Sequence, residues 1–371
     1  MTTTFDSTPI FRVFAAAVRA NVPVLLWGAP GIGKTATIEA FGRANGMHVE
    51  TLVGSNREPS DFMGFPVEVD GVTNYSELGW ARRAADAPRS LVFFDELTTS
   101  SPSVQRVMLR ILQERVVGEL RLPDSVAIVA AANPPDIAVD GWDLAAPVAN
   151  RLLHLDWTLD IDAWLDGFAT GFTKNDVPLI ANLLNDGNER YAVRVRTAVM
   201  GFLKTKPDLV LRVPSDSVSA GRGWPSPRSW TNAASVIAQL QPGDDAATLL
   251  ALEGLVGEGP ALEFMAWWAS ADLYDPYEVL KDPSIVDWTV RPDRIYALLS
   301  ALTAIASSSG KPATWTAAMK AVVACATAGR PDLGFGAARL LMHERPEGAT
   351  MPPGANDAFK DVMVRTGRWA A

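Results

Sequence analysis

The chain of 371 residues is 48 % hydrophobic and 20 % charged, which is typical of a soluble globular protein of about two domains. Its net charge of −9 argues against a strongly basic nucleic-acid-binding surface, although an acidic average does not exclude a local patch. A single cysteine excludes an internal disulfide, and no apolar run has the length of a membrane span or the setting of a secretory signal. We therefore expect a cytoplasmic protein that does not enter a membrane.

Short apolar runs alternate with helical patterns in the first part of the chain, which predicts an α/β fold with a mainly parallel sheet. Several runs are apolar at almost every position, as expected for strands buried on both faces. The predicted strands are Val22–Trp27, His48–Val53, Leu91–Phe94, Val126–Ala131 and Leu152–Asp156. Helices are predicted from Lys34 and from Pro102, where Ser101 is the N-cap ahead of a proline at the first helical position.

Beyond about Asp160 the strand patterns fade, and the sequence is predicted to be mainly helical. The predicted helices are Phe172–Leu184, Ala192–Leu203, Trp230–Leu240, Ala261–Trp268, Arg294–Ile305, Thr314–Ala328 and Phe359–Arg365. The stretch Val213–Pro227 is rich in glycine and proline and is predicted to be a long connection.

A glycine-rich segment between the first strand and the first helix matches the Walker A pattern without a mismatch. Its glycines allow backbone N–H groups to face phosphates, and the helix N-terminus adds a positive dipole end. Lys34 would contact the β- and γ-phosphates, and the Thr35 hydroxyl would be a ligand of Mg²⁺. We therefore predict that ATP is bound by Gly28, Ala29, Pro30, Gly31, Ile32, Gly33, Lys34, Thr35 and Ala36.

Two acids end the third predicted strand, as in a Walker B pattern. Asp95 at the carboxyl end of this strand is predicted to hold Mg²⁺ together with Thr35, and Glu96 to polarise the attacking water. Such a pair could instead cap the following helix, but the intact Walker A pattern upstream favours the catalytic interpretation. Asn133 follows the next strand, where it could contact the γ-phosphate or be an ordinary turn residue ahead of proline.

Two arginines are candidates for a role at the nucleotide. Arg151 lies just ahead of a strand, where an exposed residue in an ion pair would also be ordinary. Arg228 lies in the first turn of a helix that begins at Ser226-Pro227, and its charge there opposes the helix dipole. A bound nucleotide would resolve that conflict, and a solvated arginine that tolerates a small penalty is the alternative.

These motifs, in this order, resemble the AAA+ ATPases and, more narrowly, their MoxR branch. The resemblance covers roughly residues 10–240 and is strongest from Leu91 through the Ser-Pro-Ser-Val-Gln-Arg helix, in Ala130–Pro134, and at Asn150-Arg151-Leu152 and Ser226-Pro-Arg228. It implies a P-loop NTPase (AAA+) fold, with a parallel five-stranded sheet and helices on both faces, followed by an all-α lid and a helical C-terminal region. The implied domains are an AAA+ nucleotide-binding domain over residues 1–158, a lid over 159–245 and an extension over 246–371.

The resemblance also implies roles for single residues. Asn133 corresponds to sensor 1, Arg228 to sensor 2 on the lid, and Arg151 to an arginine finger that reaches the neighbouring subunit's site. Met63–Leu78 resembles the helix-2 insert hairpin and Val116–Pro123 the pre-sensor-1 hairpin of this clade. Two departures are Leu152, where relatives usually carry phenylalanine, and the long region after the sensor 2 helix. Ser55 and Asn56 occupy the place of a polar switch residue for the catalytic glutamate.

Three functions are compatible with these motifs. The leading hypothesis is a ring-shaped homo-oligomer, a hexamer by family expectation, that hydrolyses ATP to remodel a protein partner such as a von Willebrand A domain protein. The alternative is a DNA- or RNA-dependent AAA+ motor of the helicase or restriction-subunit type, which the acidic charge and the lack of a nucleic-acid module disfavour. A nucleotide-switched scaffold without turnover is the third, and the intact Asp95-Glu96 pair argues against it.

Overall fold

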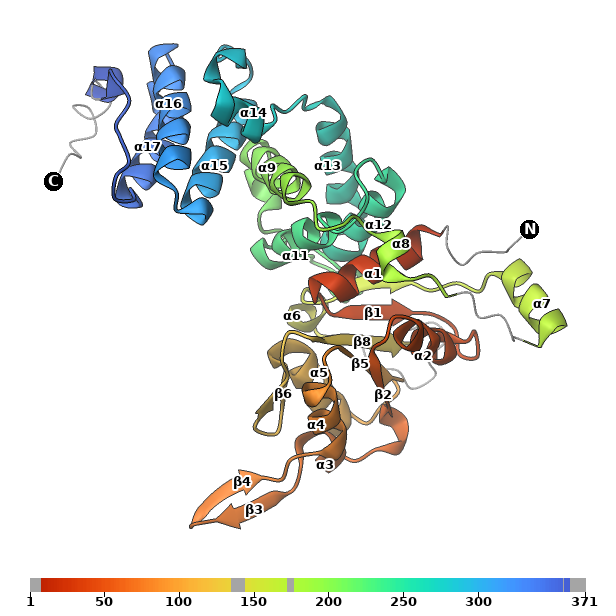
Figure 1. The fold of residues 1–371 in the computed structure, drawn as a ribbon. Coiled ribbons are helices and arrows are strands. Elements are labelled where there is room, and N and C mark those ends of the chain that lie inside the picture. Colours follow the sequence, from red (N-terminus) through yellow and green to blue (C-terminus); the bar gives the residue numbers. More distant parts are fainter. Residues whose placement is uncertain (1–7, 135–143, 172–176, 356, 361–371) are drawn as a thin grey trace. The chain divides into compact units, whose positions relative to one another are not determined.

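The computed structural model describes residues 8–134, 144–171, 177–355 and 357–360. Its centre is a parallel five-stranded sheet in the order β2-β5-β8-β1-β9 (Figure 1). The strands are β1 (Val24–Trp27), β2 (His48–Val53), β5 (Ser90–Asp95), β8 (Val126–Ala132) and β9 (Leu153–Asp156). All five predicted strands and their parallel pairing are therefore confirmed, with bounds that differ by two residues at most.

The sheet is buried on both faces because its strands carry apolar side chains at successive positions. On one face, Val92 and Phe94 of β5 belong to a core that includes residues of α3 (Ser60–Met63), α4 (Gly79–Asp86) and α5 (Pro102–Glu114). The other face packs against α1 (Pro9–Ala20) and α2 (Lys34–Ala44), where the rings of Phe14 and Phe41 meet edge to face at 4.9 Å. The sheet thus lies between two helical layers, as predicted.

Two short antiparallel hairpins leave this core. One pairs β3 (Pro66–Val69) with β4 (Val72–Tyr75), within the stretch compared above to a helix-2 insert. The other pairs β6 (Val116–Val117) with β7 (Leu120–Arg121), at the place of the predicted second hairpin. The first hairpin carries exposed apolar side chains, with Val69 and Val72 both more than half exposed. Both hairpins are present, and their contact with a client stays a prediction.

Helices are present at five of the seven later positions where they were predicted, and several further helices were not predicted. The continuous helix predicted over Phe172–Leu184 is wrong: residues 177–179 are irregular and only α8 (Ile180–Leu183) is helical, while residues 172–176 lie outside the described part of the chain. Pro178 explains the break, because proline lacks the N–H that a helix interior needs and disfavours helix at the residue before it. The helix expected over Phe359–Arg365 falls largely outside the described residues.

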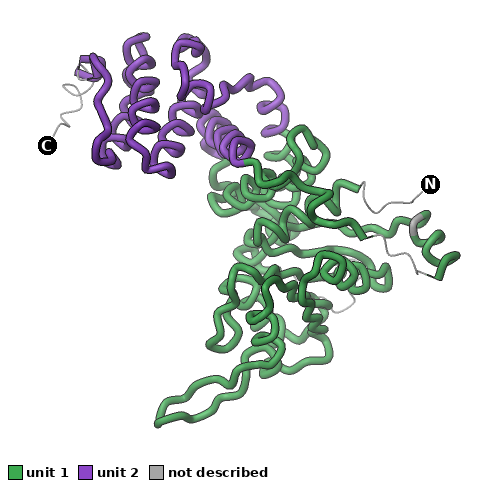
Figure 2. The backbone as a smooth tube through the Cα atoms, in the orientation of Figure 1, with its two compact units in different colours: residues 1–188, 209–262 green, residues 189–208, 263–371 purple. Residues whose placement is uncertain are grey.

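The chain divides into two compact units, coloured separately in Figure 2. Unit 1 comprises residues 1–188 and 209–262 and contains the sheet. Its remaining helices are α6 (Ala146–Ala149), α7 (Ile161–Thr170), α8, α10 (Ser217–Ala220), α11 (Pro227–Ile237) and α12 (Asp245–Val256). Of these, only α8 and α11 overlap predicted helices, and α10 lies within the predicted connection Val213–Pro227.

Unit 2 comprises residues 189–208 and 263–371. It contains α9 (Glu189–Thr205), most of α13 (Glu258–Ser270), α14 (Pro276–Lys281), α15 (Pro292–Ser309), α16 (Pro312–Thr327) and α17 (Pro331–His343). Its core includes Trp315 and Cys325 of α16. The predicted boundaries at residues 158 and 245 differ from the boundaries of these units, and the three-domain division stays a prediction. Among the helices of the described residues, none combines the length and the apolar character that crossing a membrane requires.

Candidate active site

The predicted phosphate loop joins the carboxyl end of β1 to the start of α2. Gly31 and Gly33 have φ values of 79° and 85°, in the left-handed region that only glycine enters easily, and a Cβ at either position would meet no atom within 4 Å. Backbone strain at these positions, rather than crowding, therefore requires glycine. Helix α2 follows directly, and the Gly33 N-cap has no side chain to satisfy its first N–H groups. Those N–H groups and the dipole of α2 favour an anion in the loop.

Lys34 is only 7 % exposed, and its ammonium lies inside the loop. Its Nζ donates to the carbonyl oxygens of Gly28 at 2.7 Å and Ala29 at 2.9 Å, and it lies 3.4 Å from Oδ1 of Asn133. Burial lowers the pKa of Lys34, while the negative charges of Asp95 and Glu96 raise it. The ammonium is thus held beside both the loop backbone and the end of β8.

The Thr35 hydroxyl donates to Oδ2 of Asp95, which ends β5. The other carboxylate oxygen, Oδ1, accepts the backbone N–H of Glu96 at 2.9 Å. Thr35 and Asp95 therefore present two hard oxygen atoms side by side, at the place where Mg²⁺ was predicted. Among the described residues no group of three or more His, Cys, Asp or Glu side chains could hold a metal by itself. The pair of oxygen atoms on Thr35 and Asp95 fits Mg²⁺, which proteins commonly bind through one or two side chains together with phosphates.

Glu96 follows Asp95 with a φ of 57°, which is unusual for a residue other than glycine. Its carbonyl oxygen accepts the Ser100 hydroxyl at 2.7 Å and the Ser100 N–H at 3.1 Å, so two hydrogen bonds from one residue hold this carbonyl in place. Backbone conformations of this kind are often found at functional sites. Ser55 and Asn56 lie in the short turn after β2, and no hydrogen bond joins either of them to Glu96 within the described part of the chain.

Arg151 and Arg228, the two arginines predicted to act at the nucleotide, lie on elements other than the loop and the strands that follow it. Arg151 follows α6 and donates from Nη1 to Oε1 of Gln113 in α5, a neutral partner. Its Nε is buried without a hydrogen-bond partner among the described residues. Arg228 is exposed in the first turn of α11, whose N-cap Ser226 forms the predicted cap. The structure thus brings together Lys34, Thr35, Asp95 and Asn133, with Glu96 adjacent, and leaves the finger and sensor 2 roles as predictions.

Comparison with known proteins identifies this part of the chain. Residues 23–152 match the AAA domain family of the dynein-related subfamily. Protein MoxR of Methylorubrum extorquens is 32 % identical over 119 residues, which cover 30 % of this chain and 34 % of that protein. Residues 23–152 are a MoxR-like AAA domain.

A crystal structure of a candidate ATPase from Cytophaga hutchinsonii is also similar, with a TM-score of 0.41 and 16 % identity, covering 66 % of this chain and 79 % of that one. The sequence match to MoxR spans about a third of that protein. The loop Gly28–Thr35 lies within residues 23–152, and its role in binding nucleotide stays a prediction. Arg151 lies within the matched residues and Arg228 beyond them.

Unit 1 contains a buried contact next to the loop that was not predicted from the sequence. Trp27, the last residue of β1, donates from Nε1 to Nδ1 of His154 at 2.9 Å, and Nε2 of His154 lies 2.9 Å from the carbonyl oxygen of Ala149. Burial lowers the pKa of His154 to about 4. The ring is therefore neutral at pH 7, and it connects the phosphate-loop strand to α6, the helix ahead of Arg151.

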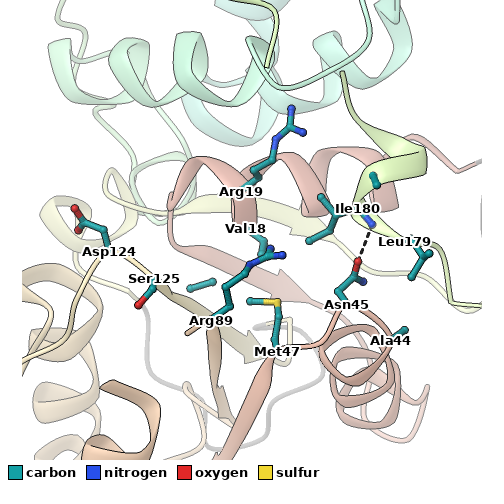
Figure 3. A pocket seen from close by; sticks show the side chains of 12 residues that line it. Val18, Arg19, Ala44, Asn45, Met47, Arg89, Asp124, Ser125, Leu179 and Ile180 are labelled. Atoms are coloured by element: carbon teal, nitrogen blue, oxygen red, sulfur yellow. Dashed lines mark hydrogen bonds between the residues drawn. The ribbon is translucent and has the colours of Figure 1, made fainter. Parts of the chain in front are cut away.

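A cavity of about 530 Å³ lies at the opposite edge of the sheet (Figure 3). It is lined by the C-terminal ends of α1, which carries Arg19, and of α2. Residues just before β5 and β8, including Arg89 and Ser125, also line it. Asn45 at its rim accepts the backbone N–H of Ile180 at 2.7 Å. Because the loop Gly28–Thr35 follows the carboxyl end of β1, this cavity is separate from the predicted nucleotide site.

Proposed function

We propose that the chain hydrolyses ATP with Mg²⁺, at a site that is completed by a neighbouring subunit of a ring. The observation that carries this proposal is the meeting of Lys34, Thr35, Asp95 and Asn133 around the uncapped start of α2. Mg²⁺, when bound, would neutralise charge on the phosphates. Thr35 and Asp95 would hold it, and Lys34 would place its ammonium beside the phosphate chain.

In this proposal Glu96 is the group that orients and polarises the attacking water, and Asn133 positions the terminal phosphate or that water. Glu96 has a fixed backbone, because its carbonyl oxygen accepts two hydrogen bonds from Ser100. A rigid attachment supports a role in orientation, since catalysis of phosphoryl transfer depends mostly on positioning and charge.

Arg151 supports the shared site. Among the described residues its side chain has one hydrogen-bond partner, the neutral Gln113, and no ion pair neutralises its positive charge. A guanidinium that is free of carboxylates can stabilise charge on a phosphate of an adjacent subunit. We propose a homo-oligomeric ring, with six subunits by family expectation, that remodels a protein partner in the cytoplasm. A von Willebrand A domain protein is the partner that the resemblance to the MoxR branch suggests.

The test compares three variants with the wild type. Arg151→Ala should retain nucleotide binding and lose turnover by on the order of 10³-fold or more, because arginine fingers contribute that much elsewhere. Glu96→Gln should bind ATP without hydrolysing it and should stabilise the ring, while Lys34→Ala serves as the control with weakened nucleotide binding. Turnover per subunit that stays constant from dilute monomer to assembled ring would contradict a shared site.

The same Glu96→Gln protein tests the partner. In ATP it should retain a von Willebrand A domain protein that Lys34→Ala does not retain. Stimulation of the wild-type ATPase by DNA, with a steep loss as salt increases, would instead support a nucleic-acid motor. The net charge of −9 leads us to expect no such stimulation.

A further inference from the structure

A buried hydrogen-bonded joint connects the segment that carries Arg151 to the helix that carries Arg228. Asn150, the residue before Arg151, is only 4 % exposed. Its Nδ2 donates to the carbonyl oxygen of Trp224 at 2.7 Å, and its Oδ1 accepts the Ser226 hydroxyl at 2.6 Å. Ser226 is 76 positions further along the chain, so this contact exists only through the tertiary fold.

The joint is also part of the cap of α11. The Ser226 hydroxyl oxygen accepts the N–H of Ser229 at 3.1 Å, while the Ser226 N–H donates to the Ser229 hydroxyl at 2.9 Å. The Ser229 hydroxyl lies 2.8 Å from the carbonyl oxygen of Trp224, which Asn150 also contacts. Buried polar groups that satisfy one another in this way resist separate movement, because any displacement leaves one of them without a partner.

The two arginines are next to this joint on either side. Arg151 directly follows Asn150, and Arg228 is two residues after Ser226. A movement of the start of α11 would therefore either pull Asn150 with it or break two buried hydrogen bonds. A movement of Arg151 could also give its Nε a hydrogen-bond acceptor, because this atom is buried without one among the described residues.

We propose that Asn150 and Ser226 are positioning residues, which couple the Arg151 finger of a subunit to the nucleotide contacted by Arg228 of the same subunit. The proposal rests on the roles proposed above for the two arginines. When α11 shifts around the bound nucleotide, the joint carries that shift to Arg151 and so to the next subunit's site. Turnover in one subunit would then depend on the nucleotide state of its neighbour, which is a coupling between two sites through one shared element.

The test uses Ser226→Gly, which removes the hydroxyl and is a mild change at an N-cap, and Ser226→Thr, which restores a hydroxyl. Each variant is assembled with increasing fractions of Glu96→Gln subunits, and ATPase activity is measured across ATP concentrations. The wild type should show cooperative ATP dependence and a curved response to the added Glu96→Gln subunits. Ser226→Gly should show a Hill coefficient of about 1 and a linear response. Its nucleotide affinity should change by less than about twofold, since the cap is a small contribution.

Ser226→Thr should restore the curved response, and a general loss of stability would not produce this pattern. Wild-type cooperativity in Ser226→Gly, no rescue by Ser226→Thr, or a wild-type protein without cooperativity would each overturn the joint. If Arg151→Ala leaves turnover intact, the proposed finger itself is wrong and the joint has no function. If Arg151→Ala abolishes turnover while Ser226→Gly behaves like the wild type, the proposed function stands and only the joint is refuted.

Discussion

Acid should destabilise unit 1 through one buried histidine. Nδ1 of His154 accepts the indole N–H of Trp27 at 2.9 Å, so this nitrogen carries no proton in the folded protein. A proton added there would oppose the indole N–H and place a charge in a fully buried site, 4 % exposed. Burial is the largest cause of the lowered pKa; the hydrogen bond to Ala149 opposes it and the charge of Arg222 adds to it. The folded pKa is about 4, against an ordinary value of 6.5.

Proton linkage decides whether the free energy of unfolding rises or falls with pH. Above about pH 6.5 neither state takes up a proton at this histidine, and the folded protein is not penalised. Between pH 6.5 and 4 the unfolded chain takes up the proton and the folded chain does not, so stability falls as the pH falls. A difference of about 2.5 pKa units corresponds to a loss of about 3 kcal/mol, reached near pH 4 and constant below it.

The assay is urea unfolding at a series of pH values for the wild type and His154→Gln. Glutamine does not titrate, and it can accept from Trp27 and donate to Ala149. Between pH 6 and 4 the free energy of unfolding should fall more steeply in the wild type, by at most about 1.4 kcal/mol per pH unit. His343→Gln, which changes an exposed histidine at the end of α17, is the matched control for replacing a histidine outside the buried contact. Parallel curves for the wild type and His154→Gln would refute the reasoning.

Three further predictions concern the loop, the packing behind it and unit 2. Lys34→Ala should weaken nucleotide binding at least about tenfold in a titration, because a hydrogen bond from a charged donor contributes about 1.5–3 kcal/mol. Unchanged affinity would show that Lys34 does not contact the nucleotide. Gly254→Ala should lower the free energy of unfolding by about 1–3 kcal/mol, since its Cβ would lie 2.3 Å from the His154 carbonyl oxygen, whereas Gly259→Ala meets no atom within 4 Å and should not destabilise. Cys325, whose pKa burial raises to about 12, should react with a thiol reagent at pH 8 only after unfolding, and fast reaction of the folded protein would show that α16 opens.

The strands were predictable because the residues that specify each strand are neighbours in the sequence. Each is a run of apolar residues bounded by turn residues, and a strand buried on both faces requires that composition whatever its neighbours are. The same holds for helix starts such as Ser226-Pro227, where cap and first position are adjacent in sequence and the structure forms the cap. The failed helix at Phe172–Leu184 shows the limit of periodicity, because Pro178 interrupts an otherwise helical apolar spacing.

The meeting of the Walker A and Walker B residues was predictable to a similar degree. Walker A and B residues are separated by 60 positions, yet both follow parallel strands, whose carboxyl ends meet at one edge of a sheet. Knowing that the strands are parallel is therefore enough to bring Thr35 and Asp95 together. The ammonium of Lys34 near Asn133 follows from the same rule.

The sequence by itself determined which residues meet at the loop Gly28–Thr35, because motif spacing and sheet topology leave them little choice. Only the tertiary structure decided what lies behind them. Trp27 meets His154 across 127 positions and Asn150 meets Ser226 across 76, and no local pattern announces either pair. A histidine or an asparagine has several possible partners in sequence, and burial selects one by making every unsatisfied polar group costly. That selection depends on how β9, α6 and α11 pack, which periodicity does not specify.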